Sequence, residues 1–212
     1  MSTASAGRTG ERRLVRRTRT TAGVAARPLK VVVTGPFSAG KTTLIQTISE
    51  VAIVGTERDV SDESRGIKAR TTVAMDFGRI TFSEDLSLFL FGTPGQRRFE
   101  VMWEILSEGM IGFILLVNAA DPRSLEESSH ILDQFRRYAD VPYVVGVTHL
   151  DDLERDPEVV FHRVREVLEV PVEVDVIACD PRAREDVKTL MLHILMGVMG
   201  RLEQAAASPA VS

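Results

Sequence analysis

The sequence contains a single cysteine, Cys179, among its 212 residues, so no disulfide can form within the chain. Such cysteine usage is typical of a reducing compartment. No apolar run reaches the roughly 18 residues that a membrane-spanning helix requires. The first residues lack the apolar stretch of a secretory signal, and the last residues offer no cysteine for prenylation. We therefore expect a cytoplasmic protein, and its 44% share of hydrophobic residues is that of a globular domain with a substantial core.

Positive charge is concentrated at one end of the chain. The net charge is −4, but residues 1–28 carry seven arginines and one acidic residue, which leaves −10 for the remainder. An acidic remainder argues against a nucleic-acid-binding core. Because residues 1–28 also contain few large apolar side chains, we predict a disordered arginine-rich arm there, a folded domain over 29–202 and a flexible tail over 203–212. The arm is either a solvated tail or a segment that contacts anionic lipid or an acidic partner.

A β-branched run, Val31 to Thr34, leads directly into Gly-Pro-Phe-Ser-Ala-Gly-Lys-Thr at 35–42, and a helical pattern follows. This arrangement predicts a phosphate-binding loop between a buried strand and a helix. Glycines let the backbone N–H groups face phosphate oxygens, and the start of the helix adds the positive end of its dipole. Lys41 is expected to reach the β- and γ-phosphates, and the Thr42 hydroxyl to bind Mg²⁺. The predicted contacts to a nucleoside triphosphate are Gly35, Phe37, Ser38, Ala39, Gly40, Lys41, Thr42 and Thr43.

Beyond this loop, apolar strands alternate with helical patterns. Strands are expected near 72–80, 86–91, 111–117, 142–147 and 172–178, the first two as a hairpin. Helices are expected over 43–51 and 101–106, after the cap-and-proline pairs Asp121-Pro122 and Asp156-Pro157, and over 186–202, where the methionines should fill the core. This alternation predicts an α/β fold with a mainly parallel six-stranded sheet and helices on both faces.

Two segments carry a more specific resemblance. The first expected hairpin strand begins Thr-Val-Ala-Met-Asp-Phe at Thr72, and the second ends in Gly-Thr-Pro-Gly-Gln-Arg-Arg-Phe over 92–99. These segments resemble the two switch regions of Ras-superfamily small GTPases, and most of all the bacterial MglA-like group with the conservon (CvnD-type) GTPases of actinobacteria. The resemblance extends over about 29–202. It implies the small-GTPase form of the P-loop NTPase fold and a GTP-hydrolysing molecular switch in bacterial signalling.

The resemblance also implies roles for single residues. Thr72 matches the switch threonine that binds Mg²⁺ and senses the γ-phosphate, and the Gly95 N–H matches a contact to that phosphate. Gln96 matches the glutamine that orients the attacking water, while Lys41 stabilises the charge of the transferred group. Arg65 and Arg70 in the long loop before Thr72 are candidates for neutralising transition-state charge, although a solvated loop arginine is the commoner case.

The base site departs from the family pattern. Guanine-specific members have Asn-Lys-x-Asp where this chain has Thr148-His149-Leu150-Asp151. Asp151 can accept both N1–H and the exocyclic amine of guanine, which adenine cannot offer. His149 could cover the base as a flat ring, and the Thr148 hydroxyl could brace the phosphate loop. Ala178 and Cys179 match the segment whose backbone N–H, here that of Cys179, donates to guanine O6. We therefore expect GTP and GDP as ligands in preference to ATP.

Two further departures bear on metal binding and hydrolysis. Gly92 stands where many small GTPases have an aspartate near Mg²⁺, so the ion must depend more on Thr42, Thr72 and the phosphates. Phe37 stands where eukaryotic members usually need glycine, so intrinsic turnover is expected to be slow. Two alternatives therefore stay open: a nucleotide-binding pseudo-GTPase with negligible hydrolysis, and a small nucleotide kinase or ATPase.

The resemblance also implies protein partners. These are a roadblock/LC7-type regulatory protein and a sensor-kinase-like membrane protein. Peripheral membrane association would then arise through these partners or through the basic arm, and no nucleic-acid partner is expected.

Overall fold

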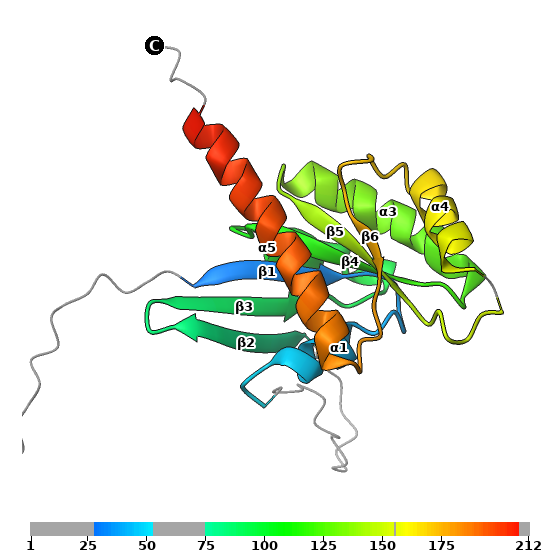
Figure 1. Cartoon of the computed structure of the whole chain (residues 1–212), viewed down its shortest axis with the longest axis horizontal. Coiled ribbons are helices and arrows are strands. Elements are labelled where there is room, and N and C mark those ends of the chain that lie inside the picture. The colour runs from blue at the N-terminus through cyan, green and yellow to red at the C-terminus, as the bar shows by residue number, and fades with distance from the viewer. Residues whose placement is uncertain (1–27, 53–74, 155, 208–212) are drawn as a thin grey trace, which may run out of the picture.

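The computed structural model describes residues 28–52, 75–154 and 156–207 (Figure 1). Several predicted features lie outside these residues: nearly all of the arginine-rich arm, Arg65, Arg70 and Thr72. Among the described residues, no helix is both long enough and apolar enough to cross a membrane.

The centre of the molecule is a six-stranded sheet with the order β2-β3-β1-β4-β5-β6. Every neighbouring pair is parallel except β2 and β3, which form the predicted antiparallel hairpin. The α/β fold with a mainly parallel sheet is thereby confirmed. The strands are β1 (Leu29–Thr34), β2 (Asp76–Ser83), β3 (Leu86–Gly92), β4 (Gly112–Asn118), β5 (Tyr143–Thr148) and β6 (Val176–Ala178).

Helices cover both faces of the sheet, as the alternation of side chains along the strands requires. In β1, Val31 and Val33 pack in one core cluster with α1 and α5, whereas Val32 packs in a second cluster with α2, α3 and α4. All seven residues of the central strand β4 are buried. The helices are α1 (Lys41–Ile48), α2 (Glu100–Ser107), α3 (Pro122–Tyr138), α4 (Pro157–Val167) and α5 (Arg184–Ala207), with a short 3₁₀ turn, η1 (Arg97–Phe99), before α2.

Both predicted cap-and-proline helix starts are confirmed. The Asp121 carboxylate accepts the backbone N–H of Arg123 at 3.0 Å, and the Asp156 carboxylate accepts that of Glu158 at 3.0 Å. In each case proline occupies the first helical position, where its missing N–H costs no hydrogen bond.

The last strand is shorter than predicted. Strand β6 contains only Val176–Ala178, and Val172 is 84% exposed. A turn replaces the first half of the expected strand, closed by the Val174 N–H donating to the Pro171 carbonyl at 3.1 Å. Because Pro171 has no N–H to offer a ladder, the alternating valines here do not mark a longer strand.

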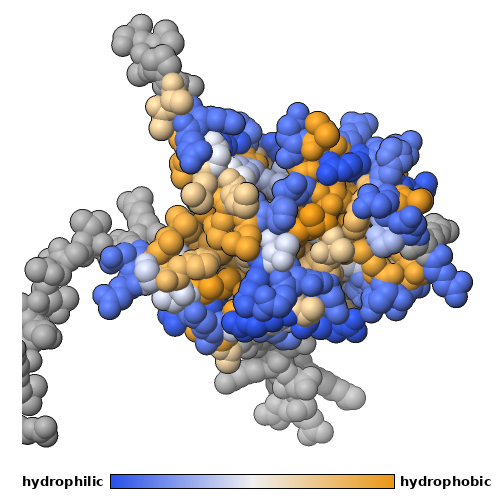
Figure 2. Space-filling model, in the orientation of Figure 1, coloured by the Kyte–Doolittle hydropathy of each residue, from blue (hydrophilic) through white to orange (hydrophobic). Residues whose placement is uncertain are grey.

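Helix α5 is longer than predicted and less buried. It continues to Ala207, into the segment expected to be a flexible tail, in keeping with the high helix propensity of its alanines. Met191 is buried as predicted, but Met196 is 68% and Met199 is 59% exposed, so the prediction that they fill the core is wrong. The second half of α5 extends past the sheet, and hydrophobic surface gathers along and beside it (Figures 1 and 2).

Candidate functional site

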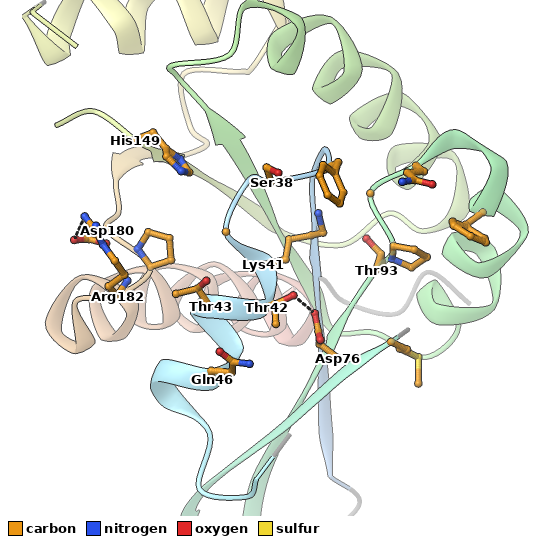
Figure 3. Close-up of a pocket in the computed structure, with 18 of the residues that line it drawn as sticks. Ser38, Lys41, Thr42, Thr43, Gln46, Asp76, Thr93, His149, Asp180 and Arg182 are labelled. Carbon is orange, nitrogen blue, oxygen red and sulfur yellow. Dashed lines mark hydrogen bonds and ion pairs between the residues drawn. The ribbon is translucent and has the colours of Figure 1, made fainter. Parts of the chain in front are cut away.

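A cleft of about 740 Å³ lies at the carboxyl ends of the parallel strands. This is the edge at which open α/β sheets bind ligands, and the volume is within the usual range for a small-molecule site. The cleft is lined by the phosphate loop and the start of α1, the start of β2, the turn after β3, and the loops after β5 and β6. Figure 3 shows Lys41 in its centre, Thr93 on one wall, and His149, Asp180 and Arg182 on the other.

Two glycines shape the predicted phosphate loop by close backbone approach. Gly35 has φ +143°, and a Cβ there would lie 2.3 Å from the Leu116 carbonyl oxygen. Gly40 has φ +95°, and a Cβ there would lie 2.6 Å from Pro181 Cγ. Only glycine fits both positions. Helix α1 begins at the next residue, Lys41, so the N-terminus of the helix faces the cleft.

Lys41 is a buried cation held inside the loop. Its side chain is only 8% exposed, and Nζ donates to the carbonyl oxygens of Gly35 at 2.8 Å and Pro36 at 2.5 Å. Burial lowers the pKa of Lys41 to about 8, an effect that Asp76 and Glu127 partly offset. Such a lysine is poorly compensated by neutral carbonyls, so an anionic phosphate would be a better partner for it.

The structure adds Asp76 to the predicted metal site. Asp76 Oδ2 accepts the Thr42 hydroxyl at 2.6 Å (Figure 3). Asp76 pairs with Gly92 across the β2–β3 hairpin, and a Cβ on Gly92 would lie 2.9 Å from Asp76 Cβ. Many small GTPases have an aspartate at the position of Gly92, and here Asp76 on the neighbouring strand places a carboxylate beside that position. The hairpin pattern in the sequence was the signal that could have revealed this pairing.

These oxygen atoms fit a hard divalent cation. A hydroxyl and a carboxylate beside a phosphate loop are the ligands that Mg²⁺ prefers, with the phosphates completing the shell. The described residues contain no group of three or more histidine, cysteine, aspartate or glutamate side chains that could hold a metal without further ligands. Thr42 and Asp76 are therefore the described residues that could hold the ion.

The turn after β3 packs directly on the phosphate loop. A Cβ on Gly95 would lie 2.5 Å from the Phe37 nitrogen and 2.6 Å from the Pro36 carbonyl carbon, so the backbones touch. The turn is also held by α2, because the buried Trp103 donates its Nε1–H to the Pro94 carbonyl at 2.8 Å. Gln96 follows as an exposed residue on the cleft wall. The turn predicted to sense the terminal phosphate therefore lies beside the loop predicted to hold it.

Two polar side chains at the ends of β4 and β5 brace the phosphate loop. The buried Thr148 hydroxyl lies 3.2 Å from the Ala39 carbonyl oxygen and 2.9 Å from His149 Nδ1. Asn118, which pairs with Thr148 between the strands, donates Nδ2–H to the Ser38 carbonyl at 3.5 Å. The amide that the sequence lacks at Thr148 is thus present one strand away, at a residue that sequence analysis missed.

The segment after β6 differs from the prediction. The Cys179 N–H, expected to donate to guanine O6, donates to the Val147 carbonyl at 2.9 Å as part of the sheet. Its thiol is buried in the core, and burial raises the pKa of Cys179 to about 12. Ala178 is exposed but does not line the cleft, and this segment contributes Asp180, Pro181 and Arg182 to the lining instead.

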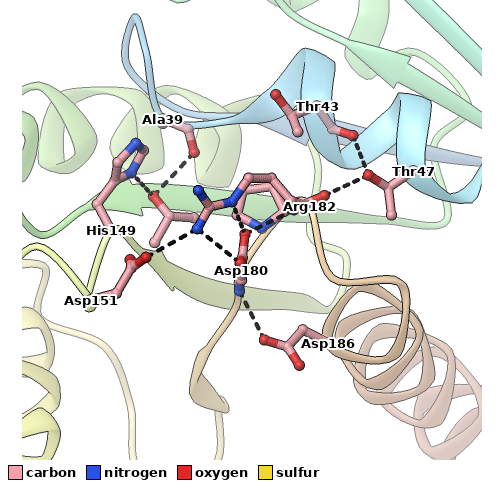
Figure 4. Close-up of polar contacts among 10 residues, drawn as sticks. Ala39, Thr43, Thr47, His149, Asp151, Asp180, Arg182 and Asp186 are labelled. Atoms are coloured by element: carbon pink, nitrogen blue, oxygen red, sulfur yellow. Dashed lines mark hydrogen bonds and ion pairs between the residues drawn. The ribbon is translucent and has the colours of Figure 1, made fainter.

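Asp151 lines the cleft as predicted for a base-reading carboxylate, but it has a partner. Arg182 Nη2 donates to Asp151 Oδ2 at 3.0 Å and to Asp180 Oδ2 at 3.0 Å (Figure 4). His149 lines the same wall, and its backbone has φ +60°, in the left-handed region that few non-glycine residues adopt. The far end of the cleft therefore offers a carboxylate, a guanidinium and a flat imidazole.

Comparison with known proteins gives a family match over most of the folded chain. Residues 52–196 match the model of a family described as conserved hypothetical ATP binding protein. An uncharacterised protein of Methanocaldococcus jannaschii, MJ1339, is 33% identical over 135 residues, which cover 63% of this chain and 78% of that protein.

The chain is also similar to part of a larger protein. Translation initiation factor IF-2 of Syntrophomonas wolfei is 27% identical over 195 residues, covering 87% of this chain and 20% of the factor. IF-2 of Geobacillus stearothermophilus is 28% identical over 191 residues, covering 86% and 23% respectively. The chain thus spans about a fifth to a quarter of the length of these factors. Together with the phosphate loop, these matches identify a P-loop nucleotide-binding protein, and the chain belongs to the family of conserved hypothetical ATP binding proteins.

Proposed function

We propose that this protein binds GTP and GDP with Mg²⁺ and acts as a nucleotide-dependent switch that hydrolyses GTP slowly. The observation that carries the proposal is a single cleft lined at one end by Lys41 and Thr42 and at the other by Asp151. A nucleotide placed with its phosphates on the loop extends its base toward Asp151. A carboxylate there selects guanine because it needs two donors that adenine does not present.

At the phosphate end, each described residue has a distinct role. Lys41 exchanges its carbonyl partners for the β- and γ-phosphates, and the N-terminus of α1 supports their charge. Thr42 and Asp76 would hold Mg²⁺, which supplies neutralisation of the phosphate oxygens when bound. Thr72 is proposed as a further metal ligand from its place in the sequence.

The hydrolytic and switch roles rest on the turn after β3. Gln96 orients a water toward the terminal phosphate, and the Gly95 N–H donates to that phosphate. Since Gly95 packs on the loop backbone and Pro94 is tied to Trp103, loss of the phosphate changes contacts that reach α2. Phe37, 68% exposed on the cleft wall, crowds the region of Gln96 and slows turnover. Arg70 would supply transition-state charge neutralisation from the preceding loop.

The partners follow from the resemblance to MglA-like and conservon GTPases. A roadblock/LC7-type protein would bind the switch surface, and a sensor-kinase-like protein would lie upstream in the same signalling system. Membrane association would then come through these proteins or through the arginine-rich arm.

ATP binding is the second candidate, and the family description favours it. Competition separates the two: GTP, GDP, ATP and XTP compete against a fluorescent guanine nucleotide in the presence of Mg²⁺. We expect GTP and GDP to displace the probe at concentrations at which ATP and XTP do not. Preferential displacement by ATP contradicts the guanine assignment.

Phosphate release tests hydrolysis separately. Wild type is expected to release phosphate from GTP slowly, Gln96→Leu more slowly still, and the control Gln134→Leu on α3 at the wild-type rate. Equal and negligible rates for all three would instead identify a pseudo-GTPase that only holds nucleotide.

A further inference from the structure

A donor and an acceptor stand side by side on the wall of the cleft that faces the base. Arg182 Nη2 lies 3.0 Å from Asp151 Oδ2, and both residues line the cleft (Figure 4). Asp151 offers acceptors alone, and the guanidinium offers donors alone. Purines differ in the order of hydrogen-bond donors and acceptors along the edge of the base, so a neighbouring acceptor and donor can distinguish one purine from another.

The position of Arg182 is set before any ligand binds. Asp180 accepts Arg182 Nε–H at 2.8 Å and Nη2–H at 3.0 Å, a two-point contact, and also the Arg182 backbone N–H at 2.9 Å. Asp180 is fixed in turn, because its own N–H donates to Asp186 Oδ2 at 2.9 Å. Arg182 therefore stays in place on Asp180 even if its contact with Asp151 changes.

The backbone of this segment has no donor left for a base. The Cys179 N–H bonds to Val147 O, the Asp180 N–H to Asp186, and the Arg182 N–H to Asp180. Pro181, between them, has no N–H. Among the described residues of this segment that line the cleft, the Arg182 guanidinium is thus the group that can still donate to an oxygen on the purine.

We propose that Arg182 is a specificity-determining residue that donates to O6 of guanine while Asp151 accepts N1–H and the exocyclic amine. The proposal rests on the proposed guanine site and adds a side-chain donor from the segment after β6, whose backbone N–H groups are already bonded. The two side chains need not separate, because a carboxylate has about four lone-pair positions and a guanidinium five N–H groups. Adenine places an amino donor where guanine has O6, so Arg182 opposes adenine donor to donor.

The test combines Arg182→Ala with base analogues that alter the edge of the purine. ITP keeps O6 and N1–H but lacks the amine, whereas 2-aminopurine riboside triphosphate keeps the amine but lacks O6 and, with it, N1–H. We expect Arg182→Ala to weaken GTP and ITP by the same factor, about 5-fold or more, from the lower end of a base-reading arginine contact. The affinity for ATP should not fall, because the variant lacks the donor that opposes the amino group of adenine. The affinity for the 2-aminopurine nucleotide, which carries only hydrogen at C6, should stay within experimental error.

Two further variants make the result specific. Arg184→Ala removes a nearby arginine that donates to the Thr47 carbonyl and lies off the cleft, so all four affinities should match wild type. Arg182→Lys keeps the charge without the forked geometry and should recover part of the GTP affinity. Thermal unfolding of each variant without nucleotide establishes that the fold is intact.

The possible results are distinct. Unchanged or raised GTP affinity in Arg182→Ala overturns the proposal, because Arg182 would then be neutral or a competitor for Asp151. Equal weakening of all four nucleotides also overturns it, since the guanidinium would then act on phosphate charge alone. If wild type binds no guanine nucleotide, the proposed function itself fails along with this inference. If wild type selects GTP and Arg182→Ala leaves that selectivity intact, only this inference fails.

Discussion

Replacing Asp76 by asparagine tests whether the carboxylate of β2 serves the metal. Asp76 Oδ2 lies 2.6 Å from the Thr42 hydroxyl and fills the space beside Gly92. Asparagine keeps the shape but removes the charge that a hard cation requires. Hydrogen bonds involving a charged group contribute about 1.5–3 kcal/mol, so the Mg²⁺-dependent part of the nucleotide affinity should fall by about one to two orders of magnitude, roughly 10- to 160-fold.

The assay is a titration of Mg²⁺ at fixed protein and fluorescent nucleotide, with a chelator defining the metal-free affinity. Asp85→Asn is the matched control, because Asp85 is exposed in the hairpin turn between β2 and β3. It should leave the Mg²⁺ dependence unchanged. An identical Mg²⁺ dependence in wild type and Asp76→Asn would refute the reasoning.

An exchange of the two residues extends the same test. Gly92→Asp alone forces a Cβ to 2.9 Å from both Asp76 Cβ and Ile45 Cδ1, which should lower the free energy of unfolding by about 1–3 kcal/mol. Adding Asp76→Gly relieves the first contact and returns a single carboxylate to the site. The double variant should then recover stability and Mg²⁺ dependence relative to either single variant. If the losses of the two single variants simply add in the double variant, in urea unfolding and in the Mg²⁺ titration, the two positions are not interchangeable.

Three further predictions concern single residues. Burial lowers the pKa of Lys41 from 10.5 to about 8, so nucleotide affinity should decline above about pH 8. The free energy of unfolding of the nucleotide-free protein should instead rise between about pH 8 and pH 10.5, by up to about 3 kcal/mol, because over this range the unfolded chain holds a proton on Lys41 that the folded chain has lost. Calorimetry checks the first trend and urea unfolding the second, and Lys41→Met should abolish both. Trp103 is the single tryptophan and bonds to Pro94, so its fluorescence should change when GTP binds, and an unchanged spectrum at saturation would argue against movement of the turn. Gly95→Ala should weaken GTP binding at least 10-fold, since its Cβ would enter the loop backbone. The control is Gly200→Ala in α5, where a Cβ would meet nothing within 4 Å, and it should leave binding unchanged.

The sequence predicted the fold well because its signals were local. Strand-to-helix alternation, the cap-and-proline pairs and the hairpin turn each act over a few residues, and the structure has these elements in place. The errors arose where the extent of the sheet determines whether a residue is paired or buried. The alternating apolar pattern at Val172 does not form a strand, because the chain makes a turn at Pro171. Met196 and Met199 are exposed because this part of α5 extends beyond the sheet that would have buried them.

The site was predictable only where it is continuous in the chain. The phosphate loop and the turn after β3 are compact motifs, and the structure brings both to one cleft. Asp76 and Asn118 were missed because each stands in for a group on the adjacent strand, at Gly92 and Thr148. The hairpin turn could have indicated the pairing of Asp76 with Gly92, but a single sequence does not state the parallel register that places Asn118 beside Thr148.

The most direct measurement is calorimetric titration of the purified full chain with GTP in Mg²⁺, for wild type and Lys41→Ala in parallel. We predict saturable binding by wild type that weakens when Mg²⁺ is chelated, and loss of this binding in Lys41→Ala while the variant still unfolds cooperatively. Absence of Mg²⁺-dependent binding to any guanine nucleotide, or equal binding by the two proteins, would contradict this prediction.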